Sequence, residues 1–363
     1  MSDVHEHTTP AKDTVSTPER GAIATFIHVL FIAPFWGDND DKEPAPADQR
    51  GWGWKRFKAY FWDIWFGPYD VLNWKIFQSL FTVSWFVWIT NYFPTRHWWL
   101  SDAGFHISRK DASWHYAEPA PLIPYEWVTA IFVVYLVLVV LYICGIWQKV
   151  LVWFMFWGAV YAQAVDQPSA FTLSKLFIVY FFVCGIAPQP ERRPGASDDE
   201  PLVMSAWPVR IIQFTLLLEY MEAGTCKLFL GDWLFQRDAL WGFSQGLYKN
   251  FFSAWILNWL TWKPFWVGFT LSAVAFEALA PVLFLWRKTR YPIAVVYGIF
   301  MHIGIAVLMK DLIYFSLQMC TFYIFWIRAE HTRALLTWMR DHLLPSSLAA
   351  KLPIKAAGGS MEL

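Results

Sequence analysis

Eight apolar segments of the chain predict membrane-spanning helices. A helix needs about 20 mostly apolar residues to cross the hydrocarbon core of a bilayer. Several of the eight are shorter than this, so their ends are fixed only to within a few residues. The predicted spans are Trp74–Phe93, Trp127–Trp147, Val150–Val165, Leu173–Ile186, Pro208–Phe229, Pro264–Trp286, Tyr291–Met309 and Leu312–Ile327. The pattern predicts an all-α, polytopic integral membrane bundle of about eight transmembrane helices, with an outer loop between the fifth and sixth spans.

The residues before the first span have a different pattern. Residues 1–20 are polar, which is typical of disorder, and they lack the basic start of a signal peptide. Ala22–Trp36 is apolar but only about 15 residues long, so it indicates an interfacial helix rather than a span. Asp38–Gly51 is rich in acids and prolines and is expected to be a linker. Trp52–Gly67 alternates aromatic and charged residues, which favours a helix lying on the membrane surface.

Basic residues near the span ends predict the orientation of the bundle, because they gather on the cytoplasmic side. The predicted inner side collects Lys55, Arg56, Lys58, Lys149, Arg192, Arg193, Arg287, Lys288, Arg290, Arg328 and Arg333. The predicted outer loops hold Arg96, Arg109, Lys110, Arg237, Lys249 and Lys263, which is fewer for their length. Both termini are therefore expected in the cytoplasm of a multi-pass protein, and we expect a bacterial inner membrane.

This organisation divides the chain into four predicted parts. They are an N-terminal region over 1–51 that includes the apolar segment 22–36, an interfacial amphipathic helix over 52–73, a transmembrane domain over 74–328, and a cytoplasmic tail over 329–363.

Composition agrees with a membrane environment. Hydrophobic residues make up 56% of the chain and charged residues 16%, against roughly 25% charged residues in soluble domains. Tryptophan accounts for 25 of the 363 residues, and aromatic rings concentrate at bilayer interfaces. The formal net charge is zero, which argues against a nucleic-acid partner. The expected surroundings are a lipid bilayer.

Ionisable residues inside the fifth predicted span are the best indication of function. Glu219, Glu222 and Lys227 interrupt an otherwise apolar run, and each costs about 2.5–3.5 kcal/mol near the centre of a membrane. Helix rise places Lys227 about 5 Å and Glu222 about 10 Å below the outer end of their span. The same estimate places His302, in the seventh span, about 10 Å deep and Glu277, in the sixth, about 20 Å deep.

Helical angles separate Lys227 from its nearest carboxylate. At about 100° per residue, Glu219, Glu222 and Cys226 share one face, while Lys227 points about 140° away from Glu222 and about 80° away from Glu219. Either Gly224 loosens the helix or Lys227 faces a partner on another span.

Structural interpretations of these residues are also open. The Lys227 side chain could carry its charge to the lipid headgroups. His302 could be a buried neutral imidazole, and the two glutamates could stabilise helix packing through hydrogen bonds. The first outer loop contains His97, Asp102, His106, His115 and Glu118. Their spacing matches no zinc pattern, so no metal is expected.

The segment from Tyr220 to Trp233 resembles the central motif of the HTTM family, the horizontally transferred transmembrane proteins, which include vitamin K-dependent gamma-carboxylase. The matching positions are a tyrosine at 220, Ala223-Gly224, Lys227-Leu228 and Trp233. The resemblance extends to Gln213, Phe276-Glu277 and Phe300-Met-His302, and to a tryptophan-rich loop after the first span. It covers roughly residues 65–330.

This resemblance implies that Lys227 acts as a base on reduced quinone, because the matching lysine of the carboxylase deprotonates reduced vitamin K. Two departures argue against peptide carboxylation itself. The carboxylase has a large soluble C-terminal portion, whereas only residues 329–363 follow the last predicted span. The carboxylase also has an essential histidine where this chain has Thr172-Leu173.

Two functions follow as hypotheses. The first is a membrane enzyme with Lys227 as the catalytic base, assisted by His302 and Glu222, on a quinol-like or lipid-like substrate; a reduced quinone is then the expected cofactor or substrate. The second is a non-catalytic accessory that binds a membrane protein during assembly, maturation, secretion or immunity. A transporter is a weaker third, because the chain lacks recognisable inverted repeats.

Overall fold

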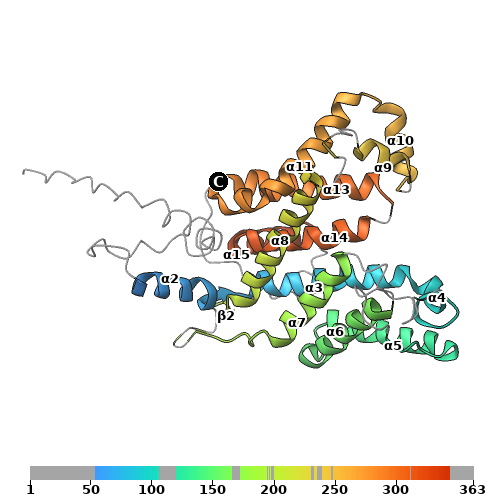
Figure 1. Ribbon diagram of the computed structural model, residues 1–363. Helices are drawn as coiled ribbons and strands as arrows, with labels where there is room; N and C mark the ends of the chain where they lie inside the picture. Colours follow the sequence, from blue (N-terminus) through green and yellow to red (C-terminus); the bar gives the residue numbers. More distant parts are fainter. Residues whose placement is uncertain are drawn as a thin grey trace, which may run out of the picture.

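The computed structural model describes residues 54–104, 106, 120–165, 172–193, 195, 197, 200–229, 233–234, 239–246, 248–310 and 312–343 (Figure 1). The expectations for residues 1–20, Ala22–Trp36 and Asp38–Gly51 fall outside this set. So do residues 166–171, between the third and fourth predicted spans, and residues 344–363 of the predicted tail.

The prediction of an all-α protein is confirmed, and each of the eight predicted spans is helical. The first six correspond to α3 (Val71–Asn91), α5 (Tyr125–Ile143), α6 (Gln148–Val165), α7 (Thr172–Ile186), α8 (Trp207–Phe229) and α11 (Lys263–Leu285). The seventh is the π-helical η5 (Arg290–Tyr297) running into α13 (Gly298–Leu308), and the eighth is α14 (Ile313–Phe322) followed by η6 (Tyr323–Trp326).

Fewer than eight of the described helices are both long enough and apolar enough to cross a bilayer. Within the described ranges, three meet both conditions: Tyr125–Ile143, Lys263–Leu285 and the continuous Arg290–Leu308. Lys175–Ile186 and Ile313–Trp326 are apolar but shorter. The structure therefore supports a membrane-associated helical protein, whereas eight crossings stay a prediction.

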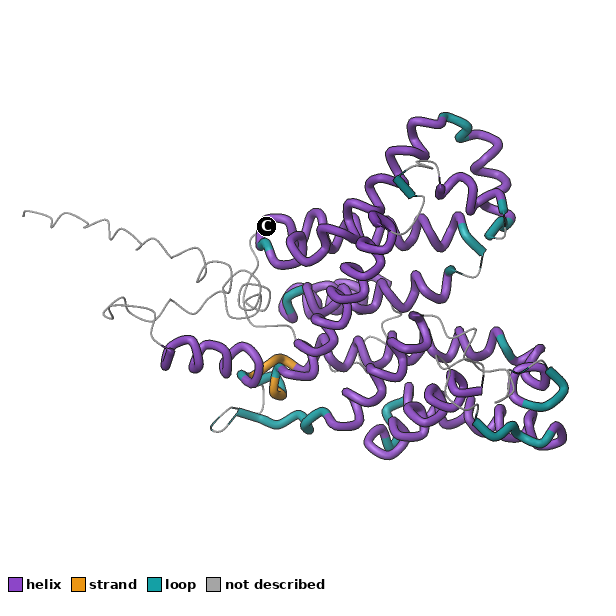
Figure 2. The backbone as a smooth tube through the Cα atoms, in the orientation of Figure 1, coloured by secondary structure: helices purple, strands orange, loops and turns teal. Residues whose placement is uncertain are grey.

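Short elements join and flank these helices. The predicted surface helix is present as α2 (Trp54–Phe66), and the predicted tail begins with α15 (Ala329–Leu343). Two helices lie within the predicted outer loop after the fifth span, α9 (Ala239–Gln245) and α10 (Phe251–Trp259). The remaining short elements are η3 (Phe93–Thr95), α4 (Arg96–Leu100), α12 (Arg287–Thr289) and the antiparallel strands β1 (Pro68–Asp70) and β2 (Val203–Ser205) (Figure 2).

A side-chain cap explains why α10 forms within the predicted outer loop. The side chain of Asn250 accepts a hydrogen bond from the Ser253 amide, and the Ser253 hydroxyl accepts one from the Asn250 amide. Such a reciprocal capping box satisfies backbone donors that a helix start leaves unpaired.

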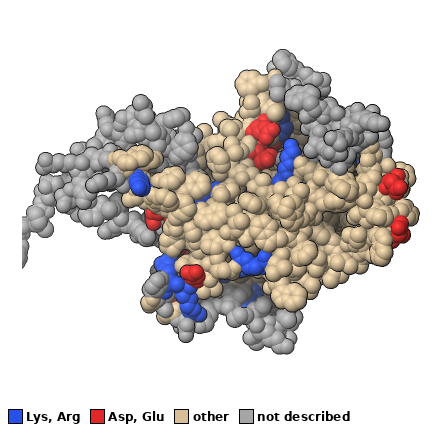
Figure 3. Space-filling model, turned by 60° about the horizontal axis from the view of Figure 1, so that its bottom comes forward, with Lys and Arg blue, Asp and Glu red and all other residues tan. Residues whose placement is uncertain are grey.

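The helices pack around α3 and α14. α5, α6 and α7 lie on one side of α3, and α11 and α13 lie on the other side of the molecule, whereas α8 runs from near β2 to α11 (Figure 1). Aromatic rings fill the centre, where Phe77 and Phe81 of α3 contact Tyr180 of α7 and Phe322 of α14. Charged side chains are sparse on the face in Figure 3, where most of the surface belongs to other residues. Large hydrophobic side chains are also exposed, among them Val134, Trp157 and Phe300, and such surfaces are typical of membrane contact.

Gly224 brings the backbones of α8 and α11 together. A Cβ atom at this position would lie 2.4 Å from the backbone nitrogen of Ala278 and 2.6 Å from its Cα. α8 continues through Gly224 to Phe229, so this glycine does not break the helix. Its missing side chain instead allows the close approach of a second helix.

Replacing Gly224 with alanine is expected to destabilise the protein by about 1–3 kcal/mol, because the added methyl group must push two backbones apart. Gly268→Ala is the matched control, since a Cβ there meets no atom within 4 Å and alanine gains up to about 1 kcal/mol of helix propensity. The measurement is SDS-induced unfolding in mixed micelles. Equal stability of the two variants would contradict the packing described here.

Candidate functional site

Lys227 forms an ion pair with Glu277. Its ammonium donates hydrogen bonds to both carboxylate oxygens of Glu277, which lies on α11. The side chains are 21% and 9% exposed, respectively. Of the two alternatives drawn from the helical angles, the structure therefore shows the partner on another helix. The charge of Lys227 is directed into the protein rather than carried outward.

The depth estimates for these two residues were inconsistent with this contact. They placed Glu277 about 15 Å deeper than Lys227 on the assumption that adjacent helices end at one level. α8 ends at Phe229, only two residues after Lys227. α11 begins at Lys263, and α9 and α10 lie in the connection between the two helices. The helices are staggered, so fourteen residues into α11 the chain reaches the level of Lys227.

An aromatic ring holds the lysine on a further side. The Lys227 nitrogen lies 4.7 Å from the centre of the Trp233 ring. A cation at this distance over an indole face is stabilised by about 0.5–2 kcal/mol, with the higher value where water is excluded. Lys227 thus contacts a carboxylate on another helix and the indole of Trp233, which follows the end of α8.

Lys227 and Glu277 line a cavity of about 750 Å³, here called the lysine cavity. This volume lies within the ~300–1,000 Å³ range of small-molecule sites. Its other lining residues are aromatic, aliphatic or uncharged: Trp88, Asn91, Tyr92, Ala223, Trp233, Leu240, Phe243, Tyr248, Ile305, Met309, Leu312, Tyr314 and Phe315. The cavity therefore offers one ionic pair within largely apolar walls.

A second, smaller hollow adjoins the lysine cavity. It has a volume of about 240 Å³ and shares Ala223, Glu277 and Phe315 with the lysine cavity. Its other lining residues are Glu219, Tyr220, Glu222, Cys226 and Met319, and we call it the acidic pocket. Glu219, Glu222 and Cys226 thus share one face, as the helical angles predicted. Glu222 itself is exposed and lines this pocket rather than the lysine cavity.

His302 lies behind the site and is 1% exposed. Its Nε2 atom is 2.8 Å from the Tyr220 hydroxyl, which is in turn 2.5 Å from the Tyr323 hydroxyl. His302 lines neither the lysine cavity nor the acidic pocket, but Tyr220 lines the latter. His302 is therefore connected to the acidic pocket through its hydrogen bond with Tyr220.

Sequence reasoning did not assign a role to Glu277, Tyr220 or Tyr323. Glu277 is an ionisable residue within a predicted span. An unpaired charge is costly there, which indicates that Glu277 needs a cationic partner. The link from Tyr220 to His302 joins residues 82 apart in the chain, and no local pattern reveals such a contact.

The histidines of the first outer loop have other partners. His97 Nε2 lies 3.1 Å from the Thr129 hydroxyl, and His106 Nε2 lies 2.7 Å from the Ser101 carbonyl oxygen. His115 and Glu118 are outside the described residues. Within the part of the chain that the structure describes, no three His, Cys, Asp or Glu side chains are grouped so that they could hold a metal ion.

No family model, curated protein or solved structure matches this chain. The resemblance to HTTM proteins consequently depends on the motif residues and on where the structure places them. Four of them make the contacts described above. Tyr220 bonds to His302, Gly224 packs on Ala278, Lys227 pairs with Glu277, and Trp233 covers the ammonium.

Removing the carboxylate alone should destabilise the protein more than removing the whole pair. Glu277→Leu leaves a largely buried ammonium without its partner, at a cost of about 3–5 kcal/mol. The double variant Lys227→Met/Glu277→Leu removes both charges and is expected to recover most of that loss.

The measurement is a double-mutant cycle from SDS-induced unfolding in mixed micelles. Glu222→Leu serves as the control, because an exposed carboxylate is expected to change stability by only about 0.5 kcal/mol. Additive effects of the Lys227 and Glu277 substitutions would show that the two side chains do not interact.

Proposed function

We propose that the chain is a multi-pass integral membrane protein of the HTTM type, with eight spans and cytoplasmic termini. In this proposal the Lys227–Glu277 pair performs acid–base chemistry on a quinol-like or lipid-like substrate. The observation that carries it is the placement of the pair in the wall of a cavity of about 750 Å³ that is otherwise mostly apolar.

The walls of the lysine cavity favour a substrate with an apolar body and a small polar end. Rings of Trp88, Phe243 and Phe315 offer flat apolar contacts, whereas Lys227 and Glu277 offer charge at one place. Sites of this kind orient a ligand by a few polar groups and gain affinity from apolar burial. A quinol ring with its hydroxyl toward Lys227 fits this distribution.

The paired carboxylate gives the lysine a route to its basic form. In this scheme Lys227 first passes one proton to Glu277, whose carboxylate oxygens already accept its hydrogen bonds. The neutral amine then has a lone pair that accepts the proton of a substrate hydroxyl. The ammonium formed in that step stabilises the substrate oxyanion by charge.

His302 and Glu222 assist from outside the cavity in this scheme. Through Tyr220, His302 fixes the face of α8 that carries the site. Glu222 is exposed and lines the acidic pocket, which Glu277 also lines. It is placed to exchange protons between Glu277 and the surroundings. Both are therefore positioning or relay residues, and Lys227 is the group proposed to meet the substrate.

The convergence of the motif residues supports the HTTM resemblance as part of this proposal. Tyr220, Gly224, Lys227 and Trp233 each contact another part of one site, as residues of a functional motif are expected to do. Carboxylation of a peptide is not included, because Thr172-Leu173 stands where the carboxylase has an essential histidine.

A non-catalytic accessory is the second candidate, favoured by aromatic side chains on α10. Phe251, Phe252, Trp255 and Trp259 are all largely exposed, and exposed aromatic patches are typical of protein or membrane contacts. In this alternative α10 would bind another membrane protein, and the lysine cavity would have a structural role.

The two candidates are separated by an anaerobic titration of the purified protein with 2-methyl-1,4-naphthoquinol. The wild type is expected to bind this probe and shift its absorption toward that of the quinolate. Lys227→Met should lose the shift, and Lys227→Arg should bind without the shift because arginine cannot release its proton. Lys249→Met, which removes an exposed lysine outside the cavity, should behave as wild type.

Binding with a full shift in Lys227→Met would exclude this lysine as the base. If the wild type neither binds nor shifts the probe, the quinol substrate is excluded and the accessory role is favoured.

A further inference from the structure

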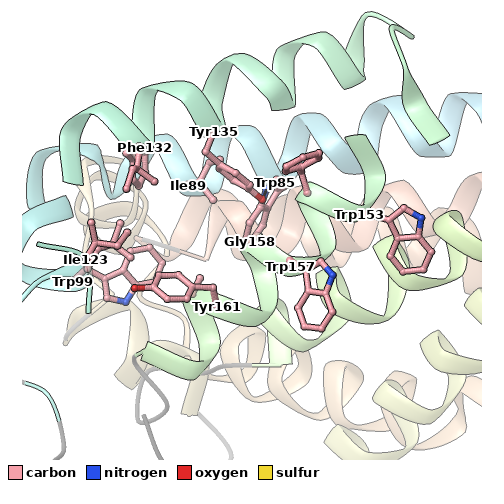
Figure 4. A pocket seen from close by; sticks show the side chains of 14 residues that line it. Trp85, Ile89, Trp99, Ile123, Phe132, Tyr135, Trp153, Trp157, Gly158 and Tyr161 are labelled. Carbon is pink, nitrogen blue, oxygen red and sulfur yellow. Dashed lines mark hydrogen bonds between the residues drawn. The ribbon is translucent and has the colours of Figure 1, made fainter. Parts of the chain in front are cut away.

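A third cavity lies between α3, α5 and α6, away from Lys227. Its volume is about 430 Å³, within the ~300–1,000 Å³ range of ligand sites. Four tryptophans line it, Trp85, Trp99, Trp153 and Trp157, and we call it the tryptophan cavity. Figure 4 shows Trp99 at one end, beside Ile123 and Tyr161, and Trp153 at the other.

The walls of the tryptophan cavity are suited to hydrocarbon. None of the described residues that line it is charged. The polar atoms of Trp85 and Tyr135 bond to each other at 3.1 Å, and the Tyr135 hydroxyl also donates to the Met155 carbonyl oxygen at 3.3 Å. Water inside would find few partners, and apolar cavities of this kind take apolar ligands.

The mouth of the cavity opens on the outer face of α5 and α6. Trp85 at its floor is 1% exposed, whereas Ile131 and Trp157 at its rim are 46% and 62% exposed. The rim helix α5 is one of the three helices with the length and apolarity for a bilayer crossing. With α5 across a bilayer, as in the proposed topology, lipid chains rather than water meet this opening.

A cation near one end indicates which hydrocarbon the cavity would take. The Arg96 guanidinium lies 4.3 Å from the centre of the Phe93 ring, and Phe93 contacts Phe132, which lines the cavity. Arg96 is outside the lining; its Nε donates to the hydroxyl of Thr129, on the same helix as Phe132, and one terminal nitrogen donates to the Phe93 carbonyl oxygen. An arginine close to the end of an apolar slot complements the phosphate of a phospholipid whose acyl chain occupies the slot. An isoprenoid quinone carries no such anion.

The tryptophan cavity is separate from the proposed catalytic site. The Trp99 ring stacks on Tyr92 at 4.4 Å and meets Trp88 edge-on at 5.9 Å. Trp88 and Tyr92 line the lysine cavity, whereas Trp99 lines the tryptophan cavity. These rings form a wall between the two, so an occupant of one does not depend on chemistry in the other.

We propose that the tryptophan cavity is a binding site for one acyl chain of a bilayer phospholipid, held with its phosphate toward Arg96. The site is independent of the function proposed for Lys227.

The test uses full-length protein in nanodiscs that contain phosphatidylglycerol with a diazirine near the end of one acyl chain. After irradiation, the labelled peptides are mapped by mass spectrometry. Label is expected on α5 and α6 at the rim, above the level on Val282 of α11, whose exposure lies between those of Ile131 and Trp157. Ala162→Trp fills the cavity and should reduce this label by about tenfold. Val160→Trp on the same helix, outside the lining, should not.

Competition with unlabelled lipids in the wild type gives a second measurement that needs no folded variant. Excess unlabelled phosphatidylglycerol should reduce the rim label, whereas excess isoprenoid quinone should not. In a separate experiment, Arg96→Gln should reduce the rim label left by the phospholipid probe. Label spread over all exposed helices in proportion to exposure would overturn the proposal. Equal competition by the quinone, or a cross-link from the rim to a second copy of the chain, would also overturn it.

Discussion

The architecture on one side of this molecule depends on the contact between Lys227 of α8 and Glu277 of α11. Two charges in an apolar bundle are tolerable only when each neutralises the other, and this requires the helices to lie close together. Gly224 supplies that closeness, because its missing Cβ lets the backbone of α8 touch Ala278. The glycine and the ion pair thus act together. The small residue sets the distance between α8 and α11, and the two charges fix how far one helix is shifted along the other.

Around this contact the molecule has hollows of different character. The lysine cavity has an ionic pair within aromatic walls, whereas the tryptophan cavity has aromatic walls without charge. Trp88, Tyr92 and Trp99 lie between them. The chain's many tryptophans therefore act as more than interfacial anchors, since some of them shape and separate interior spaces.

The sequence predicted the helices well and their mutual placement poorly. Hydropathy located α3 to within a few residues, because a long apolar run has few alternative structures. It did not locate α10, where the Asn250 cap decides the outcome. For the site, helical angles separated Lys227 from Glu222 but could not identify Glu277 as the partner. That contact depends on the stagger of α8 and α11, which is set by tertiary packing and not by the pattern within either helix.

The central claim is that Lys227 and Glu277 present a proton-exchanging pair to an apolar ligand in the lysine cavity. It is tested most directly by a cryo-electron microscopy map of the full chain in nanodiscs with 2-methyl-1,4-naphthoquinol. The account predicts ligand density in the lysine cavity, with its hydroxyl within hydrogen-bond distance of the Lys227 nitrogen and Glu277 on the opposite side of that nitrogen. A Lys227 side chain extended to the lipid headgroups, or a cavity closed by its own side chains, would contradict it.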